Sequence, residues 1–429
     1  MELHSAKLDE AAAELRSGEC DPSAYVDELC DRIDETDTDV ESFLAEPDRR
    51  ARLKTESRAL TERVDSLERP PLYGIPIGVK DIVHVEGLAT KAGGDVPPEL
   101  FGGPEAAVVE SFRNAGALVL GKTVTTEFAM SAPGPTRNPH DLEHTPGGSS
   151  SGSAAAVGAG LCPLAIGSQT NGSVIRPAAF CGVVGYKPSL GRIPTEGIVT
   201  LSPSADHIGL FTQNVAGMEL AASVACRRWR EIDPDERPTL GIVDGPYLEQ
   251  ASPAAREALE ESVATLEAAG YETCRAVAFE DIEAVNREQK KLTAAEISLS
   301  LGSWARDHEE SFRPVTLERV REGYDVSAKE LLDARDNRLA TRQSLADQMD
   351  ETGIDLWLSP PALGPAPEGI DDTGDPIMNA PWTHAGMPVV TIPSGTVDGL
   401  PVGVQVSAPF EADERLFAWA KGIEAALRA

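Results

Sequence analysis

The amino-acid sequence predicts an α/β protein, and three observations along the chain carry that prediction. The first 65 residues have the pattern of helices, short apolar runs separated by glycine begin at Pro70, and residues 240–279 predict a strand, a helix and a second strand. A strand–helix–strand unit is typical of sheets that carry helices on their faces. With 429 residues, the chain is long enough to bury such a sheet.

The helical opening contains a clear start signal. Asp21 followed by Pro22 forms an N-cap and first-turn pair, after which apolar residues recur at helical spacing. The residues expected to share the buried face are Tyr25, Val26, Leu29 and Ile33. This segment is predicted to cover the core.

Short strands are expected next. Ile75, Ile77 and Val79 alternate toward Lys80, so Lys80 is predicted to end a strand. Residues 117–120 form a compact apolar run that predicts a second buried strand. Residues 145–191 are rich in Gly, Ser and Ala but hold enough apolar side chains to pack, so they are not interpreted as a linker.

The second half of the chain alternates strands with helices. Residues 240–243 predict a strand, Ser252 with Pro253 opens a helix that Gly270 stops, and residues 273–279 predict the next strand. Residues 280–350 are charged and mostly helical, contain no recognisable catalytic pattern, and are expected to form an insertion that shapes a pocket. Their expected buried positions are Leu331, Leu332, Leu339 and Leu345. Strands return at 356–358, 389–392 and 402–406, before a closing helix over 416–427.

The charge balance disfavours several classes of partner. Lys and Arg total 38 against 70 Asp and Glu, a formal net charge of −32, which repels phosphate backbones and anionic membranes. Neither nucleic acid nor a membrane is therefore expected as a direct partner. The acidic excess is spread along the chain, which favours a host with a high-salt cytosol, and screening by that salt would permit a homodimer.

Cysteine usage and the chain start indicate a cytoplasmic protein. The six cysteines have no C-x-x-C spacing and are too sparse for a disulfide scaffold. Residues 1–10 contain charges without an apolar core, and no run of 18 uninterrupted apolar residues occurs.

Two short motifs have competing interpretations. Residues 116–123, GALVLGKT, match the phosphate-binding pattern G-x-x-x-x-G-K-[ST], but the variable positions are the predicted strand, whose amides a sheet would occupy. Ser150 is central in a G-x-S-x-G match typical of a nucleophile elbow, with Asp206, His207 and His384 as possible partners. Polar, proline-punctuated residues 138–146 precede it where an elbow requires an apolar strand. Nucleotide binding and the elbow are kept as alternatives.

One loop combines potential metal ligands. It contains His140, Asp141, Glu143 and His144. Prolines flank these residues and nothing indicates helical order, so a solvated polar loop is the preferred interpretation and no metal is expected.

A longer pattern runs through four stretches of the chain. They are Gly74–Asp81, Pro146–Ala154, Asn171–Ser173 and Phe180–Pro188. In this order and spacing the chain resembles the amidase signature family, with further matches at 121–130, 206–209, 381–393 and 399–405. The resemblance implies a single domain over 1–429, in which a mixed central sheet is flanked by helices. Its parts would be a helical cover (1–65), a catalytic core (66–215), a variable substrate-shaping region (216–350) and a C-terminal return to the core (351–429).

The resemblance also implies a catalytic unit made of Ser173, Ser149 and Lys80, with a cis peptide bond before Ser149. An amide carbonyl is a weak electrophile, so the attacking serine must lose its proton, and a lysine can accept it only when neutral. Burial away from carboxylates lowers a lysine pKa, and strand alternation should turn Asp81 away from Lys80. The family places the amides that stabilise the oxyanion just before the nucleophile, here at Thr170, Asn171, Gly172 and Ser173.

The surrounding pocket is expected to include Ser150, Glu127, Met130, Gln169, Arg176 and Trp382. Several residues depart from the family pattern. Ser151 replaces a common Gly, Gln169 and Asn171 replace a common Asp and Gly, and Arg176 lies three residues after Ser173 where many members have it two after.

The implied reaction is hydrolysis of a carboxylic amide to acid plus ammonia or amine through an acyl-serine, with neither cofactor nor metal. The alternative is the A subunit of an Asp/Glu-tRNA(Asn/Gln) amidotransferase, which releases ammonia from glutamine and works with partner subunits. Gln169 and Asn171 weigh against that alternative, because this subunit usually keeps the Asp and the double Gly.

Overall fold

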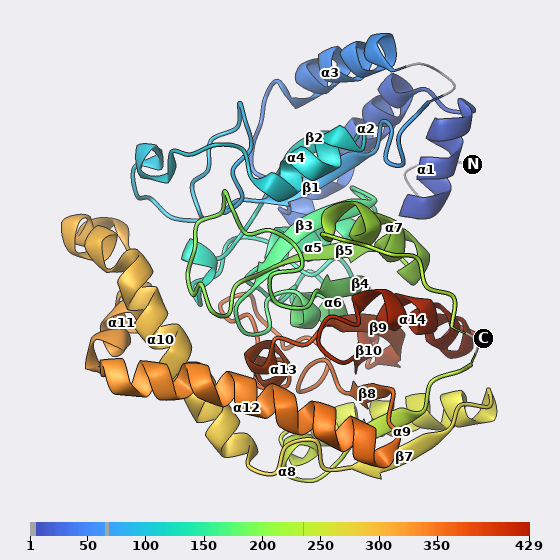
Figure 1. Ribbon diagram of the computed structural model, residues 1–429. Helices are drawn as coiled ribbons and strands as arrows, with labels where there is room; N and C mark the ends of the chain where they lie inside the picture. Colours follow the sequence, from blue (N-terminus) through green and yellow to red (C-terminus); the bar gives the residue numbers. More distant parts are fainter. Residues whose placement is uncertain (1–5, 65–67, 235) are drawn as a thin grey trace.

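A computed structural model describes residues 6–64, 68–234 and 236–429, and its centre is one mixed sheet (Figure 1). The strands in the described part are β1 (Pro76–Lys80), β2 (Leu118–Thr123), β3 (Leu164–Gln169), β4 (Val184–Lys187), β5 (His207–Thr212), β6 (Leu240–Val243), β7 (Thr273–Ala276), β8 (Leu356–Ser359), β9 (Val389–Val397) and β10 (Leu400–Ser407). Their order across the sheet is β2-β1-β3-β5-β4-β9-β10-β8-β6-β7. The predicted α/β class is confirmed. The proposed boundary at 65/66 and the first five residues lie outside the described residues.

The two ends of the sheet are parallel and its middle is antiparallel. β2, β1 and β3 run parallel to one another, and so do β8, β6 and β7. Between these ends, each strand from β3 through β5, β4, β9 and β10 to β8 is antiparallel to the next. The predicted strand–helix–strand unit is the parallel pair β6 and β7 with α9 (Pro253–Ala268) between them, although β7 ends three residues before the predicted end at 279.

The N-terminal helices cover the β2 end of the sheet (Figure 1). They are α1 (Leu8–Ser17), α2 (Pro22–Val40), α3 (Arg49–Arg63) and α4 (Ala107–Asn114). The carboxylate of Asp21 accepts hydrogen bonds from the first amides of α2, as the sequence predicts. The four apolar residues expected on its inner face are buried.

Short helices rich in small residues pack beside the central strands. They are α5 (Ser151–Gly158), α6 (Ile175–Phe180) and α7 (Val215–Ala225). α5 lies against β1, β2 and β3, and a Cβ at Gly152 would overlap the backbone of Ser42 and Val124. The glycine therefore permits the close approach of the start of α5 to the residue that follows β2.

The predicted helical insertion forms a projecting arm (Figure 1). This helical arm consists of α10 (Ile282–Asp307), α11 (Pro314–Glu322) and α12 (Ala328–Thr352). The prediction that Leu332 and Leu339 are buried is wrong, because both are 58% exposed. The inner face of α12 is set instead by Ala334, Arg338, Thr341, Leu345 and Met349, whose spacing of three and four places those two leucines on the outer face.

The remaining helices complete the second half of the fold. They are α8 (Pro246–Glu249), α13 (Ala380–Ala385) and α14 (Asp413–Leu427), with short 3₁₀ turns at Pro98–Phe101, Glu127–Ala129, Glu309–Ser311 and Gly323–Asp325. α13 packs against both α10 and α12. It thereby connects the helical arm with the sheet.

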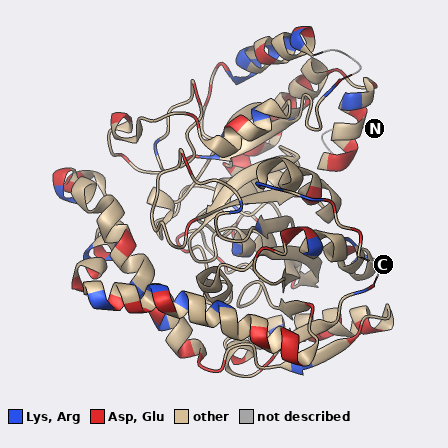
Figure 2. Ribbon diagram, in the orientation of Figure 1, with Lys and Arg blue, Asp and Glu red and all other residues tan. Residues whose placement is uncertain are grey.

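Charged residues lie mostly on the helices, and few of them lie on the strands (Figure 2). All six cysteines are unpaired. Among the helices of the described residues, none has both the length and the apolar character needed to cross a membrane.

Candidate active site

Lys80 ends β1 as predicted, and its side chain is fully buried among hydroxyl groups. Its Nζ lies 2.7 Å from Ser149 Oγ, 3.0 Å from Ser150 Oγ and 2.9 Å from Ser168 Oγ. No carboxylate of residues 6–64, 68–234 and 236–429 forms an ion pair with it. Burial holds the pKa of Lys80 well below its usual range, and the negative charge of Asp206 only partly opposes that shift.

Asp81 points away from Lys80 and pairs with a different lysine. Its carboxylate lies 3.0 Å from Nζ of Lys122, with side chains that are 1% and 5% exposed. Lys122 also donates to the Val83 carbonyl at 2.9 Å. The negative charge of Asp81, which follows Lys80 in sequence, is therefore balanced by Lys122 and not by Lys80.

Ser149 follows a cis peptide bond from Gly148, and its carbonyl is fixed by residues that follow β2. Thr125 Oγ1 donates to this carbonyl at 3.2 Å, and the Thr126 amide does so at 3.3 Å. These bonds hold the backbone of Ser149 while its hydroxyl faces Lys80.

Ser150 is clamped to β3. Its Oγ donates to the Ser168 carbonyl at 3.1 Å and accepts from the Ser168 amide at 3.2 Å. Its other partner is Lys80. Both histidines of the nucleophile-elbow alternative have other partners, since His207 contacts the Ala205 carbonyl and His384 contacts Gln289, so the geometry does not support the elbow.

The loop between β3 and α6 is held by buried side chains. Gln169 Oε1 accepts from the amides of Val174 and Ile175 at 2.8 and 3.0 Å, and its Nε2 donates to Thr383 Oγ1 at 2.9 Å. Thr170 Oγ1 donates to Asp206 at 2.7 Å. Burial raises the pKa of Asp206 to about 6.

Three successive carbonyls of this loop each have a donor. Thr170 O accepts from Gln289 Nε2 at 3.0 Å, Asn171 O from Thr383 Oγ1 at 2.7 Å, and Gly172 O from the Arg176 amide at 3.1 Å. In contrast, the amides that follow them, at 171, 172 and 173, donate to none of the described residues. The carbonyls of this loop therefore have hydrogen-bond partners, whereas the three amides have none among the described residues.

A cavity of about 590 Å³ opens at this loop and includes Ser173 in its wall. The Ser173 side chain is half-buried, and its hydroxyl bonds to no side chain or backbone group in the described part of the chain. The structure thus brings Lys80 and Ser149 together and leaves Ser173 facing the cavity without a hydrogen bond to Ser149. The wall also includes Met130, Thr170, Asn171, Arg176, Asn286, Gln289, Lys290, Thr293, Thr373 and Ile377.

Four residues expected in the pocket lie outside the cavity wall, namely Ser150 and Gln169, whose contacts are given above, and Glu127 and Trp382. The Glu127 carboxylate accepts from the Arg313 amide at 3.1 Å and so connects its loop to the start of α11. Trp382 donates to the Tyr247 hydroxyl at 3.0 Å and packs edge-on against Phe279.

Arg176 is buried at the cavity wall and joins two segments. Its Nη2 donates to the Gly148 carbonyl at 2.7 Å, and its Nε donates to the Thr373 carbonyl at 2.7 Å. It therefore fixes the backbone immediately before Ser149. Desolvation lowers the pKa of its guanidinium to about 10.

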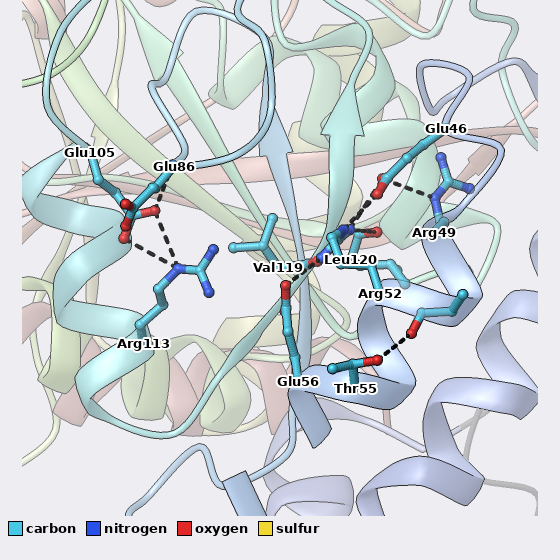
Figure 3. Close-up of polar contacts among 11 residues, drawn as sticks. Glu46, Arg49, Arg52, Thr55, Glu56, Glu86, Glu105, Arg113, Val119 and Leu120 are labelled. Carbon is cyan, nitrogen blue, oxygen red and sulfur yellow. Dashed lines mark hydrogen bonds and ion pairs between the residues drawn. The ribbon is translucent and has the colours of Figure 1, made fainter. Parts of the chain in front are cut away.

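The segment that matches the phosphate-binding pattern is the edge strand β2 (Figure 3). Its inner side pairs with β1, and Arg52 donates to the carbonyls of Val119 and Leu120 at 2.9 and 3.3 Å. A hollow of about 830 Å³ lies beside it, but Arg113 there is paired with Glu105. With Lys122 also occupied by Asp81, the geometry does not support nucleotide binding.

The candidate metal-ligand loop has ordinary polar contacts. His140 Nε2 lies 3.0 Å from the Cys181 carbonyl, and His144 lies 3.2 Å from Asp141. Among the described residues, no group of three or more His, Cys, Asp or Glu is arranged to hold a metal ion.

Two of the residues that organise this site were not singled out from the sequence. Ser168 lies on β3 directly before Gln169, and its place beside that expected pocket residue was an available signal. Gln289 lies in the helical arm, and nothing local in the sequence distinguishes it from its neighbours.

The chain is similar to known proteins over most of its length. A family model described as Amidase matches residues 24–417. The A subunit of the glutamyl-tRNA(Gln) amidotransferase of Chromohalobacter salexigens is 30% identical over 470 residues, covering 96% of this chain and 95% of the relative. The protein of the same name from Syntrophus aciditrophicus is 31% identical over 463 residues, covering 95% and 94%.

Solved structures give the same result. A crystal structure of an amidase superposes with a TM-score of 0.88 at 30% identity, covering 98% of this chain and 99% of the other. The native peptide amidase from Stenotrophomonas maltophilia has a TM-score of 0.85 at 26% identity, covering 100% and 98%.

Proposed function

The chain belongs to the amidase family, enzymes that act on carbon–nitrogen bonds, and we propose that it hydrolyses a carboxylic amide through an acyl-serine on Ser173. The observation that carries this proposal is the contact of 2.7 Å between Lys80 Nζ and Ser149 Oγ, close to a cavity whose wall includes Ser173. The product is a carboxylic acid, released with ammonia or an amine.

The proposed proton path runs from Ser173 to Ser149 and then to Lys80. Ser173 attacks the amide carbonyl as its proton passes to Ser149, whose own proton passes to the neutral amine of Lys80. The reverse transfer protonates the leaving nitrogen, and water then hydrolyses the ester. The lowered pKa of Lys80 supports this role, because an ammonium cannot accept a proton.

Backbone amides would stabilise the negative oxygen of the intermediate. In a trans peptide, the amide of one residue points opposite to the carbonyl of the residue before it. Since the carbonyls at 170, 171 and 172 are each held by a donor, the amides of Asn171, Gly172 and Ser173 each point away from the donor of the preceding carbonyl. The N–H groups of these three amides are free to donate to an oxyanion, and Thr170 is the first residue of the same loop.

A second function is favoured by the curated relatives. The two relatives from Chromohalobacter and Syntrophus are each named as the A subunit of an amidotransferase, at 30 and 31% identity. In this role the chain would release ammonia from glutamine and work together with partner subunits. Both functions share the acyl-serine step and differ in the fate of the ammonia.

The test is ammonia release by the isolated chain in concentrated KCl, with glutamine and with aliphatic, aromatic and amino-acid amides. Ser173→Ala and Ser149→Ala should abolish release, whereas Ser223→Ala should retain it, because Ser223 only bonds within α7. Turnover of varied amides supports a free-standing amidase. Weak hydrolysis of glutamine alone supports the amidotransferase role, and an active Ser173→Ala variant contradicts both functions.

A further inference from the structure

A glutamine on the helical arm reaches the loop that carries the unused amides. Gln289 of α10 is 2% exposed, and its Nε2 donates to the Thr170 carbonyl at 3.0 Å and to Asn171 Oδ1 at 2.9 Å. It is 119 residues away in sequence from Thr170. The buried side-chain amide of Gln289 therefore donates to two successive residues of the proposed oxyanion loop.

The other end of Gln289 is fixed by a second buried contact. Its Oε1 lies 2.8 Å from His384 Nδ1, and His384 Nε2 lies 2.9 Å from Oδ1 of Asn337 on α12. Burial and the charge of Arg338 lower the pKa of His384 to about 3, so the ring is neutral and carries one proton.

The hydrogen-bond network assigns that proton. Both acceptors on the loop require Gln289 to present its nitrogen to them, which leaves Oε1 to accept from His384 Nδ1–H. Nε2 of this tautomer can only accept, so the Asn337 amide must be turned to present its nitrogen, in place of Oδ1, for this contact to be a hydrogen bond. Gln289 is therefore held at both ends of its side-chain amide, and several bonds orient a side chain more rigidly than a single bond.

The same face of α10 borders the cavity. Asn286, Lys290 and Thr293 lie close to Gln289 along the helix, within about one turn, and all three are in the cavity wall. A substrate that contacts this helix would therefore touch the element that also holds the Thr170–Asn171 peptide.

We propose that Gln289 is a positioning residue that fixes the Thr170–Asn171 peptide so that the Asn171 amide faces the oxyanion. The inference rests on the proposed function. Because the Thr170 carbonyl and the Asn171 amide belong to one planar unit, holding the carbonyl also fixes the direction of the amide. The helical arm thereby contributes to the chemical step as well as to the shape of the cavity.

The first test is Gln289→Glu, which preserves size and removes the donor while the carboxyl is ionised. At pH 8 we expect kcat to fall about 10²-fold with KM within threefold, since loss of one oxyanion donor costs 10²–10³. At lower pH the protonated carboxyl can donate to the Thr170 carbonyl again. The ratio of variant to wild-type kcat should therefore rise as pH falls.

Dividing the kcat of the variant by that of the wild type at each pH removes the effect of groups that titrate in both proteins. These belong to Lys80, to Asp206 beside Thr170, and to His384, while Arg338 stays charged throughout. Gln348→Glu is the matched control, because Gln348 lies on α12 and donates to the Ala278 carbonyl outside the site. Its ratio to wild type should stay near one at every pH.

These experiments distinguish a failure of the positioning role of Gln289 from a failure of the proposed function. A folded Gln289→Glu with wild-type kcat, or with only a raised KM, overturns the positioning role while Ser173→Ala remains inactive. If Gln289→Glu does not fold, the half-buried Asn337→Leu replaces it. A drop in kcat at constant KM then supports the inference, and an unchanged kcat overturns it. Activity in Ser173→Ala contradicts the proposed function itself.

Discussion

Two buried lysines on neighbouring strands should respond to the same substitution in opposite ways. Lys80 ends β1, and Lys122 lies on β2 in register with Val79, the residue before Lys80. Lys80 contacts hydroxyls and a carbonyl, whereas Lys122 forms an ion pair with Asp81 at 3.0 Å. Replacing each lysine with methionine keeps most of the side-chain volume and removes the amine.

In Lys80→Met the loss should be catalytic. A general base contributes up to about 10⁴ in rate, which corresponds to about 5.4 kcal/mol at 1.36 kcal/mol for each tenfold change. No buried carboxylate loses its partner, so we expect the free energy of unfolding to change by less than about 1 kcal/mol.

In Lys122→Met the loss should be structural. Asp81 is 1% exposed and would keep an unpaired charge, which costs about 3–5 kcal/mol. That is a large part of the roughly 5–15 kcal/mol typical of a folded protein. The folded fraction should retain kcat within about threefold.

Urea unfolding and ammonia release measure the two effects on the same preparations. The double variant Asp81→Asn/Lys122→Met should regain most of the lost stability, because it removes both charges. A Lys80→Met enzyme with more than a tenth of wild-type kcat would refute the base assignment. A Lys122→Met protein as stable as wild type would refute the argument about the buried pair.

Three further perturbations test the site and the surface. Asp206→Asn removes the charge that favours the ammonium of Lys80, so the pKa of Lys80 should fall and the acid limb of kcat/KM should move to lower pH. The effect should be seen above about pH 6, where Asp206 is ionised, and a shift to higher pH would contradict it. Gly172→Ala would place a Cβ 2.9 Å from Arg176 Nη1 and displace the amide loop, so kcat should fall about tenfold or more, and an unchanged kcat would argue against an oxyanion role. Raising KCl from about 0.1 to 2 M should raise Tm, since counterions screen the net charge of −32; a falling Tm would contradict adaptation to high salt.

Local signals in the sequence predicted most of the elements correctly. Asp21 with Pro22 and Ser252 with Pro253 are caps whose side chains bond to amides within three residues, so their effect is independent of the rest of the fold. Lys80 could be placed because strand alternation is also local. Leu332 and Leu339 were misplaced because composition alone does not say which face of a charged helix meets the core.

Long-range contacts in the site could not be predicted in this way. Thr383 holds Asn171 across 212 residues and Gln289 holds Thr170 across 119, and both contacts form only when α10 and α13 pack together beside the loop that follows β3. Trp382 was expected in the pocket, but its neighbour Thr383 makes the contact with the loop. Helix geometry explains the difference, since adjacent residues point about 100° apart.

The Arg52 contact with β2 has a consequence for the behaviour of the protein in concentrated solution. An edge strand with free carbonyls is a template on which another chain can add a strand and start aggregation. Arg52 occupies the Val119 and Leu120 carbonyls and is itself held by Glu46 and Glu56 (Figure 3). When salt screens the repulsion between acidic molecules, two copies of the chain can approach each other closely. The Arg52 guanidinium then keeps two carbonyls of β2 unavailable to a strand of another molecule.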